Sequence, residues 1–193
     1  MLVGHELYSP LKPAKVGEGA FPRVKGANSS PSSHCAHSLP DQQRRNYMTL
    51  RVLLADDYKI VRDGLRVLLE QGGFNVVGEA ANGREAVEQA AQLEPDIVVL
   101  DLSMPDLNGI EAAREILRLL PRTCAIILTV HRDEQYVQQA FQAGARGYVL
   151  KTRATSDLIS AIMDVGEGKI FLSPEIPRRV IQPYLRAAGA GSA

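Results

Sequence analysis

Cysteine is scarce in this chain of 193 residues: it occurs twice, as Cys35 and Cys124, in segments of very different character. Two such cysteines do not suggest a framework of disulfides. Long hydrophobic runs are also missing, and without about 18 consecutive apolar residues no membrane-spanning helix is expected. The N-terminus has no apolar core segment of the kind that a signal peptide needs. The cytoplasm is therefore the expected location.

An excess of charge of either sign is absent as well. The 22 basic residues balance 22 acidic ones, so the chain as a whole gives no electrostatic reason to expect nucleic-acid binding. Hydrophobic residues make up 45% of the sequence. That share is enough for one α/β domain with a complete core, with residues left over.

The first 47 residues differ in composition from the rest. Five prolines lie between Tyr8 and Pro40, together with a Ser-rich stretch over residues 28–33, and no helical or strand periodicity persists. This composition predicts a disordered N-terminal extension over residues 1–47. Two explanations stay open: a mis-started or dispensable leader with Met48 as the true initiator, which the composition favours, and a tail that binds a partner.

From Met48 onward, short apolar runs alternate with segments of helical periodicity. The expected strands are Leu50–Ala55, Phe74–Ala80, Ile97–Leu100, Cys124–Leu128 and Tyr148–Leu150, and the expected helices are Lys59–Gln71, Arg84–Leu93, Ile110–Leu120, Asp133–Gln142 and Thr155–Gly166. Nearly all-apolar strands that alternate with helices predict a parallel sheet covered on both faces. The expected fold class of residues 48–168 is therefore α/β, a flavodoxin-like (βα)5 doubly wound parallel sheet with strand order 2-1-3-4-5.

Polar side chains follow four of these strands at their carboxyl ends, where ligands bind in sheets of this type. Asp56 and Asp57 follow the first strand, Asp101 the third, Thr129 the fourth and Lys151 the fifth. Taken singly, each residue is more often a helix cap or a solvated surface charge than a functional group. Their joint placement at four separate strand ends favours a shared site.

The residue types at these strand ends suit phosphoryl chemistry. Three close carboxylates repel one another, and Mg²⁺ removes that cost because it accepts a few carboxylates together with waters and phosphate oxygens. Zinc is not expected, because His131 and Cys124 are the only histidine and the only cysteine after Met48. A carboxylate beside Mg²⁺, an ammonium and a hydroxyl can attack phosphorus and form an acyl phosphate.

Four blocks of sequence, in this order, carry a resemblance to a known family. They are Leu53–Asp57 (LLADD), Val98–Gly109 (VVLDLSMPDLNG), Ile127–Thr129 (ILT) and Gly144–Lys151 (GARGYVLK). Over about residues 50–168 the chain resembles the receiver domain of two-component response regulators. The sequences of the last block and of Gly168–Pro174 (GKIFLSP) are similar to those of the NarL/FixJ (LuxR-type) branch of this family.

The resemblance implies a phosphoryl site with assigned roles. Asp101 would be the phosphoacceptor. Mg²⁺ would be held by Asp57 directly, by Asp56 through water, by Asp101, and by the backbone carbonyl of Ser103. Lys151 would pair with the phosphoryl group.

The resemblance also implies a switch. Thr129 and Tyr148 would form the switch pair, in which the hydroxyl moves onto the phosphoryl group and the aromatic ring turns inward. Ser103 and His131 each stand two residues beyond a site residue. From there they would border the path of water and tune the lifetime of the phosphoryl group.

The function implied is that of a response regulator receiver rather than an enzyme. A sensor histidine kinase would supply the phosphoryl group, and the output would be transcriptional regulation, with a homodimer formed on phosphorylation. The alternative is a stand-alone receiver that acts by protein contact without DNA binding. A haloacid-dehalogenase-like phosphatase would need a second aspartate where Ser103 stands, and a flavin-binding protein would meet repulsive acidic strand ends.

The end of the sequence departs from the branch that it resembles, which normally continues into a helix-turn-helix domain. Arg178, Arg179 and Arg186 give local positive charge after Pro174. However, about 20 residues interrupted by Pro183 are too few for a three-helix DNA-binding domain. Residues 169–193 are expected to be a linker helix and a flexible tail, and no DNA-binding domain is expected in this chain.

Overall fold

The structure, a computed structural model of the chain, describes residues 50–184. The N-terminal extension expected over residues 1–47, and the part of the expected tail that follows residue 184, lie outside the described residues. No helix within the described part is long and apolar enough to cross a membrane.

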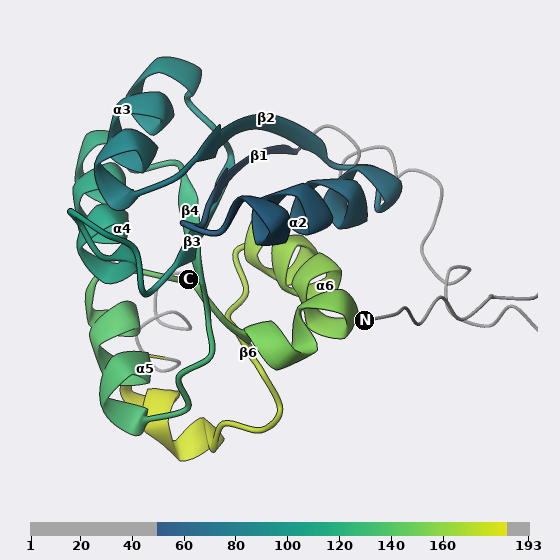
Figure 1. Cartoon of the computed structure of the whole chain (residues 1–193). Helices are drawn as coiled ribbons and strands as arrows, with labels where there is room; N and C mark the ends of the chain where they lie inside the picture. Colours follow the sequence, from purple (N-terminus) through teal and green to yellow (C-terminus); the bar gives the residue numbers. More distant parts are fainter. Residues whose placement is uncertain (1–49, 185–193) are drawn as a thin grey trace, which may run out of the picture. The chain divides into compact units, whose positions relative to one another are not determined.

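The described residues form one six-stranded parallel sheet (Figure 1). The strands are β1 (Arg51–Ala55), β2 (Asn75–Ala80), β3 (Ile97–Asp101), β4 (Cys124–Thr129), β5 (Gly147–Leu150) and β6 (Phe171–Leu172). They lie in the order β2-β1-β3-β4-β5-β6, and each neighbouring pair is parallel. The flavodoxin-like order 2-1-3-4-5 is confirmed, and β6 is an additional strand that the residue pattern did not predict.

Helices cover both faces of the sheet (Figure 1). They are α2 (Lys59–Gln71), α3 (Gly83–Leu93), α4 (Gly109–Leu119), α5 (Glu134–Gln142) and α6 (Ala154–Gly166), with short 3-10 helices η1 (Lys151–Arg153) and η2 (Arg178–Ile181). Along β1, Val52 and Leu54 pack in one core cluster with α2 and α6, whereas Leu53 and Ala55 pack in the other with α3, α4 and α5. This alternation is the period-2 geometry of a strand buried on both faces.

Local sequence accounts for where the helices begin and end, within one residue of the predicted bounds. The Asn82 side chain accepts a hydrogen bond from the amide of Glu85 (2.8 Å) and caps α3, as predicted. The Asn108 side chain caps α4 by accepting bonds from the amides of Ile110 and Glu111, each at 3.0 Å. After α2, Gly73 has a φ of 88°, a left-handed conformation in which glycine is favoured.

Residues 171–184, here called the C-terminal arm, cover the outer edge of β5 and part of α5. The amide of Ser173 donates to the carbonyl of Tyr148 (3.0 Å), and the Ser173 hydroxyl accepts from the amide of Leu150 (3.1 Å). Arg179 forms an ion pair with Glu134 of α5 (3.0 Å). Ile176 is buried in the same cluster as α5. The arm therefore satisfies the backbone groups of an otherwise open strand edge.

The linker helix expected within residues 169–193 takes a different form in the described part. A two-residue strand comes first, and helical structure begins only at η2 and continues through residues 182–184. The apolar side chains of Leu172 and Val180 are buried against the domain. This segment is therefore part of the domain's core as far as residue 184.

Candidate phosphoryl site

Three carboxylates meet at the carboxyl edge of the sheet, as the strand-end pattern predicts. Asp56 and Asp57 directly follow β1, and Asp101 is the last residue of β3. One carboxylate oxygen from each lies within 4.8 Å of the others. Asp56 and Asp101 are buried, at 1% and 4% exposure, whereas Asp57 faces solvent. β1 and β3 are neighbours in the sheet, and their parallel pairing brings these residues together.

Lys151, the first residue of η1 after β5, reaches back into this cluster. Its Nζ lies 2.7 Å from Oδ2 of Asp56 and 3.0 Å from Oδ2 of Asp101. Burial alone would lower the pKa of the ammonium, but the two carboxylates outweigh it and the pKa is raised. Lys151 is therefore a firmly charged cation between two buried carboxylates.

The Asp101 carboxyl lies in an environment that disfavours its charged form. Burial raises its pKa above the ordinary value, and the Asp56 carboxylate adds to this effect, whereas Lys151 opposes it. Two negative charges next to one positive charge leave the pocket with an excess of negative charge. An additional cation at the open side would relieve that excess.

The donor set fits a hard divalent cation. Oδ2 of Asp56 is buried, and apart from its ion pair with Lys151 no donor among residues 50–184 makes a hydrogen bond with it. The Asp57 carboxylate has no hydrogen bond or ion pair within the same residues. The three carboxylates keep oxygen lone pairs that are available to an ion, and the cluster is open to solvent on the side of Asp57. This arrangement matches the oxygen-rich, partly hydrated coordination of Mg²⁺.

The segment that runs from the end of β3 to the first residue of α4 packs very closely against Asp101. A Cβ atom at Gly109 would clash with the carbonyl oxygen of Asp101, so only glycine fits there without a shift of the backbone. In the same loop Asp106 has a φ of 64°, in the left-handed region that aspartate tolerates better than most residues. The loop that carries Ser103 is thus shaped by close packing onto Asp101.

The residues predicted to form the switch meet at His131. The Thr129 hydroxyl accepts a hydrogen bond from the amide of His131 (3.1 Å). The Tyr148 hydroxyl donates to the carbonyl of His131 (3.1 Å), and its ring is fully buried. Burial also raises the pKa of the Tyr148 phenol, so it remains a hydrogen-bond donor at neutral pH. The resemblance implies that the Tyr148 ring turns inward on phosphorylation, and in this structure the ring already lies buried.

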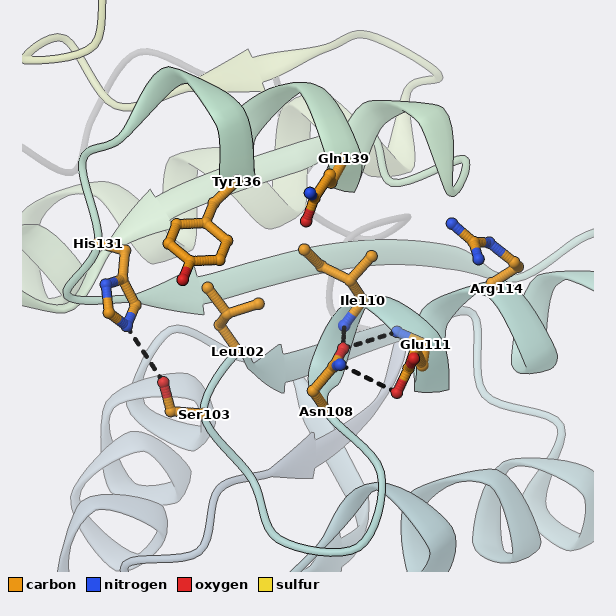
Figure 2. A pocket seen from close by; sticks show the side chains of 9 residues that line it. All are labelled: Leu102, Ser103, Asn108, Ile110, Glu111, Arg114, His131, Tyr136 and Gln139. Atoms are coloured by element: carbon orange, nitrogen blue, oxygen red, sulfur yellow. Dashed lines mark hydrogen bonds between the residues drawn. The ribbon is translucent and has the colours of Figure 1, made fainter.

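The side chain of His131 links this switch group to the loop after Asp101. Figure 2 shows its ring turned toward the Ser103 hydroxyl, and Nε2 lies 3.3 Å from that oxygen. On its other side the ring lies against Tyr136, with centroids 4.9 Å apart. Ser103, His131 and Tyr136 all line a cavity of about 410 Å³ between α4 and the start of α5, whose other lining residues are Leu102, Asn108, Ile110, Glu111, Arg114 and Gln139.

One contact of the site was not predicted from the sequence. Arg62 of α2 donates from Nη1 to the backbone carbonyl of Asp56 at 2.5 Å. One indication of this contact is present in the sequence: Arg62 is a charged residue that lies between Val61 and Leu65, on the side of the helix that faces the sheet. Such a residue is seldom left without partners when its side chain is largely buried.

Comparisons with known proteins agree with this geometry. The model of the response regulator receiver domain matches residues 52–163. Among curated proteins, the chain is 36% identical over 138 residues to the transcriptional regulatory protein LnrK of Bacillus subtilis, covering 71% of this chain and 63% of the relative. It is 37% identical over 130 residues to the response regulator VraR of Staphylococcus aureus, covering 67% and 62%. The chain thus spans less than two thirds of the length of these relatives.

Solved structures give the same result. A LuxR-family two-component response regulator from an Aurantimonas species matches with a TM-score of 0.66 and 38% identity over 71% of this chain and 99% of that one. The isolated receiver domain of RcsB from Salmonella enterica serovar Typhimurium, in the presence of the phosphomimetic BeF3−, matches with a TM-score of 0.61 and 32% identity, covering 68% and 98%. The chain therefore belongs to the response regulators of two-component systems, with a receiver domain whose relatives are of the LuxR/NarL type.

Proposed function

We propose that the chain accepts a phosphoryl group on Asp101 and changes conformation in response. The observation that carries this proposal is the bridge of Lys151 between the buried carboxylates of Asp56 and Asp101, at the strand ends of a receiver fold. A cation held beside an acidic nucleophile is what a dianionic phosphoryl group requires on its arrival. The acidic cluster alone would repel that group.

In the proposed reaction a carboxylate oxygen of Asp101 attacks phosphorus, and the bond from phosphorus to the donor's leaving atom breaks. With a sensor histidine kinase as donor, that leaving atom is a phosphohistidine ring nitrogen, which keeps the electron pair. The product is an acyl phosphate on Asp101. Lys151 neutralises negative charge on the transferred group, and the Thr129 hydroxyl stabilises that charge by donating a hydrogen bond.

Asp56, Asp57, Asp101 and the backbone carbonyl of Ser103 would hold Mg²⁺, as the donor set allows. When bound, Mg²⁺ supplies positive charge to the carboxylates and to the phosphoryl oxygens. The residues of the chain contribute a nucleophile fixed at the end of β3 and the partly buried ammonium of Lys151. Both are preorganised, so little rearrangement accompanies transfer.

The switch proposed here runs through His131. The Thr129 hydroxyl now accepts a hydrogen bond from the His131 amide, and rotation of the Thr129 side chain to donate to a phosphoryl oxygen would break that bond. The backbone of His131 also accepts the bond from Tyr148. Movement of His131 would therefore shift the ring of Tyr148 and the start of α5. Together these groups would form a bistable element of the kind that phosphorylation biases.

Incubation with a small phosphodonor such as acetyl phosphate tests the proposal. In the presence of Mg²⁺, intact-mass spectrometry is expected to show the mass of one phosphoryl group added, and chelation of Mg²⁺ is expected to abolish the gain. Hydroxylamine should remove the group, because it cleaves acyl phosphates. A chain that stays unmodified with Mg²⁺ and donor in excess would contradict the proposed function.

His131→Ala is expected to shorten the lifetime of the phosphoryl group. Loss of the imidazole removes its bridge to Ser103 and opens the side of the site from which water approaches. A hydrogen bond of about 1 kcal/mol corresponds to a rate change of roughly fivefold. Autodephosphorylation of the isolated chain measures this. Gln139→Ala is the matched control, because Gln139 lines the same cavity without a bond to Ser103. Equal autodephosphorylation rates for the wild type and His131→Ala would contradict this role of His131.

The partners proposed are a sensor histidine kinase and, after phosphorylation, a second copy of this chain. Both follow from membership of the family. Transcriptional output is proposed because the relatives are named as transcriptional regulatory proteins. Residues 50–184 contain no helix-turn-helix, so DNA binding through such a motif would need residues outside this range. Sedimentation velocity with and without phosphodonor measures the homodimer.

A further inference from the structure

Asp56 is anchored by three hydrogen bonds, two of them with residues outside the sheet. Its amide donates to the carbonyl of Ala80 in β2 (3.1 Å), and its Oδ1 accepts from the amide of Tyr58 (3.0 Å). Its own carbonyl lies beyond the end of β1 and accepts from Nη1 of Arg62 at 2.5 Å. A buried carbonyl needs a partner, and here the partner is a guanidinium.

Arg62 is itself held in place. Its side chain is only 12% exposed, and its Nε lies 3.4 Å from Oε2 of Glu79 on β2. The other oxygen of Glu79 accepts from Nε of Arg66, at 2.5 Å. Glu79 therefore orients two arginines from neighbouring turns of α2, but of these two only Arg62 reaches the site. A planar guanidinium can bind two acceptors at fixed angles, which a lysine ammonium does not reproduce.

The carbonyl that Arg62 binds belongs to the peptide that joins Asp56 to Asp57. Asp56 is fixed by its other contacts, whereas the Asp57 carboxylate is exposed and has no hydrogen bond or ion pair within residues 50–184. The direction of the Asp57 side chain therefore depends on how this peptide plane is held. A free plane would let the carboxylate sample many directions, at an entropic cost to any ion that needs it in one.

We propose that Arg62 is a positioning residue of the metal site: it holds the peptide between Asp56 and Asp57 and thereby sets the affinity for Mg²⁺. This role rests on the proposed function. The sign of the effect separates it from simple electrostatics. A positive charge near three carboxylates opposes cation binding, so removal of that charge alone would tighten Mg²⁺ binding. Loss of positioning would weaken it.

The test compares Arg62→Gln with Arg66→Gln in the full chain. Both changes remove one positive charge and one contact with Glu79, but only the first frees the Asp56 carbonyl. Isothermal titration with Mg²⁺ is expected to show about tenfold or greater weakening for Arg62→Gln and little change for Arg66→Gln. In metal-free protein, hydrogen exchange of the Tyr58 amide is expected to speed up in Arg62→Gln alone. Equal or tighter Mg²⁺ binding by Arg62→Gln would overturn the proposal.

Two further outcomes keep the test decisive. If Arg62→Gln does not fold, Arg62→Lys carries the comparison: it keeps the charge but cannot reach both acceptors, so it should bind Mg²⁺ several-fold more weakly, and wild-type affinity would overturn the proposal. If the unsubstituted chain itself binds no Mg²⁺, the proposed function fails first. That result is distinct from equal binding by wild type and variant, which overturns the role of Arg62 alone.

Discussion

Asp101→Asn will accept no phosphoryl group from a small donor, even with Mg²⁺ in excess. The amide is close in shape to the carboxylate, but its oxygen is a far weaker nucleophile and cannot form a stable acyl phosphate. Intact-mass spectrometry measures the loss. Asp106→Asn is the matched control, because Asp106 lies exposed in the loop that follows Asp101 and asparagine also tolerates its left-handed φ. Full labelling is expected for the control, and residual labelling of Asp101→Asn at the same position would contradict the assignment.

The same substitution is expected to leave the metal-free protein at least as stable as wild type at pH 7. Burial raises the pKa of Asp101 in the folded state, so the folded protein holds this proton more tightly than the unfolded chain. Its contribution to stability is present below the unfolded pKa and is lost as pH rises through the folded pKa. Asparagine does not ionise, so its advantage should shrink on acidification. Urea unfolding with a chelator at several pH values measures this, and a large loss of stability at neutral pH would contradict it.

Gly109→Ala will destabilise the domain and slow phosphorylation. The added Cβ would meet the carbonyl group of Asp101 and Cα of Leu102, and these backbone atoms cannot rotate away. Overpacking of this kind costs about 1–3 kcal/mol, and relief by movement of the Asp101 backbone would displace the nucleophile. Urea unfolding and the rate of labelling by a phosphodonor measure the two effects.

Gly64→Ala provides the control for Gly109→Ala. Gly64 lies inside α2, and a Cβ there would meet nothing within 4 Å. Alanine should therefore stabilise the helix by about 0.5–1 kcal/mol. Phosphorylation should be unaffected. Equal stability changes at the two glycines would show that the close approach at Asp101 is not what requires glycine.

Much of this architecture follows from local sequence. Strands such as Ile97–Asp101 are short apolar runs next to turn residues, and Asn82 marks a helix start by its own hydrogen bond. Parallel order then brings strand ends to one edge. For that reason the cluster of Asp56, Asp57 and Asp101 is predictable from the amino-acid sequence alone.

The parts that sequence did not predict depend on contacts between distant segments. β6 has two residues and exists because Ser173 bonds to β5 at Tyr148 and Leu150. No period-2 pattern is detectable in two residues. The contact from Arg62 to the Asp56 carbonyl likewise depends on how α2 lies against the sheet, and the hydrogen bond of the Tyr148 hydroxyl depends on an acceptor in another loop.

Locating the phosphoryl group on the chain tests the central claim most directly. Borohydride reduces an aspartyl phosphate to homoserine, and tandem mass spectrometry then identifies the modified residue. After treatment with phosphodonor and Mg²⁺, we expect homoserine at position 101 and at no other. Homoserine at position 56 or 57 with Asp101 unchanged, or a phosphoryl group that resists hydroxylamine on another side chain, would contradict the account.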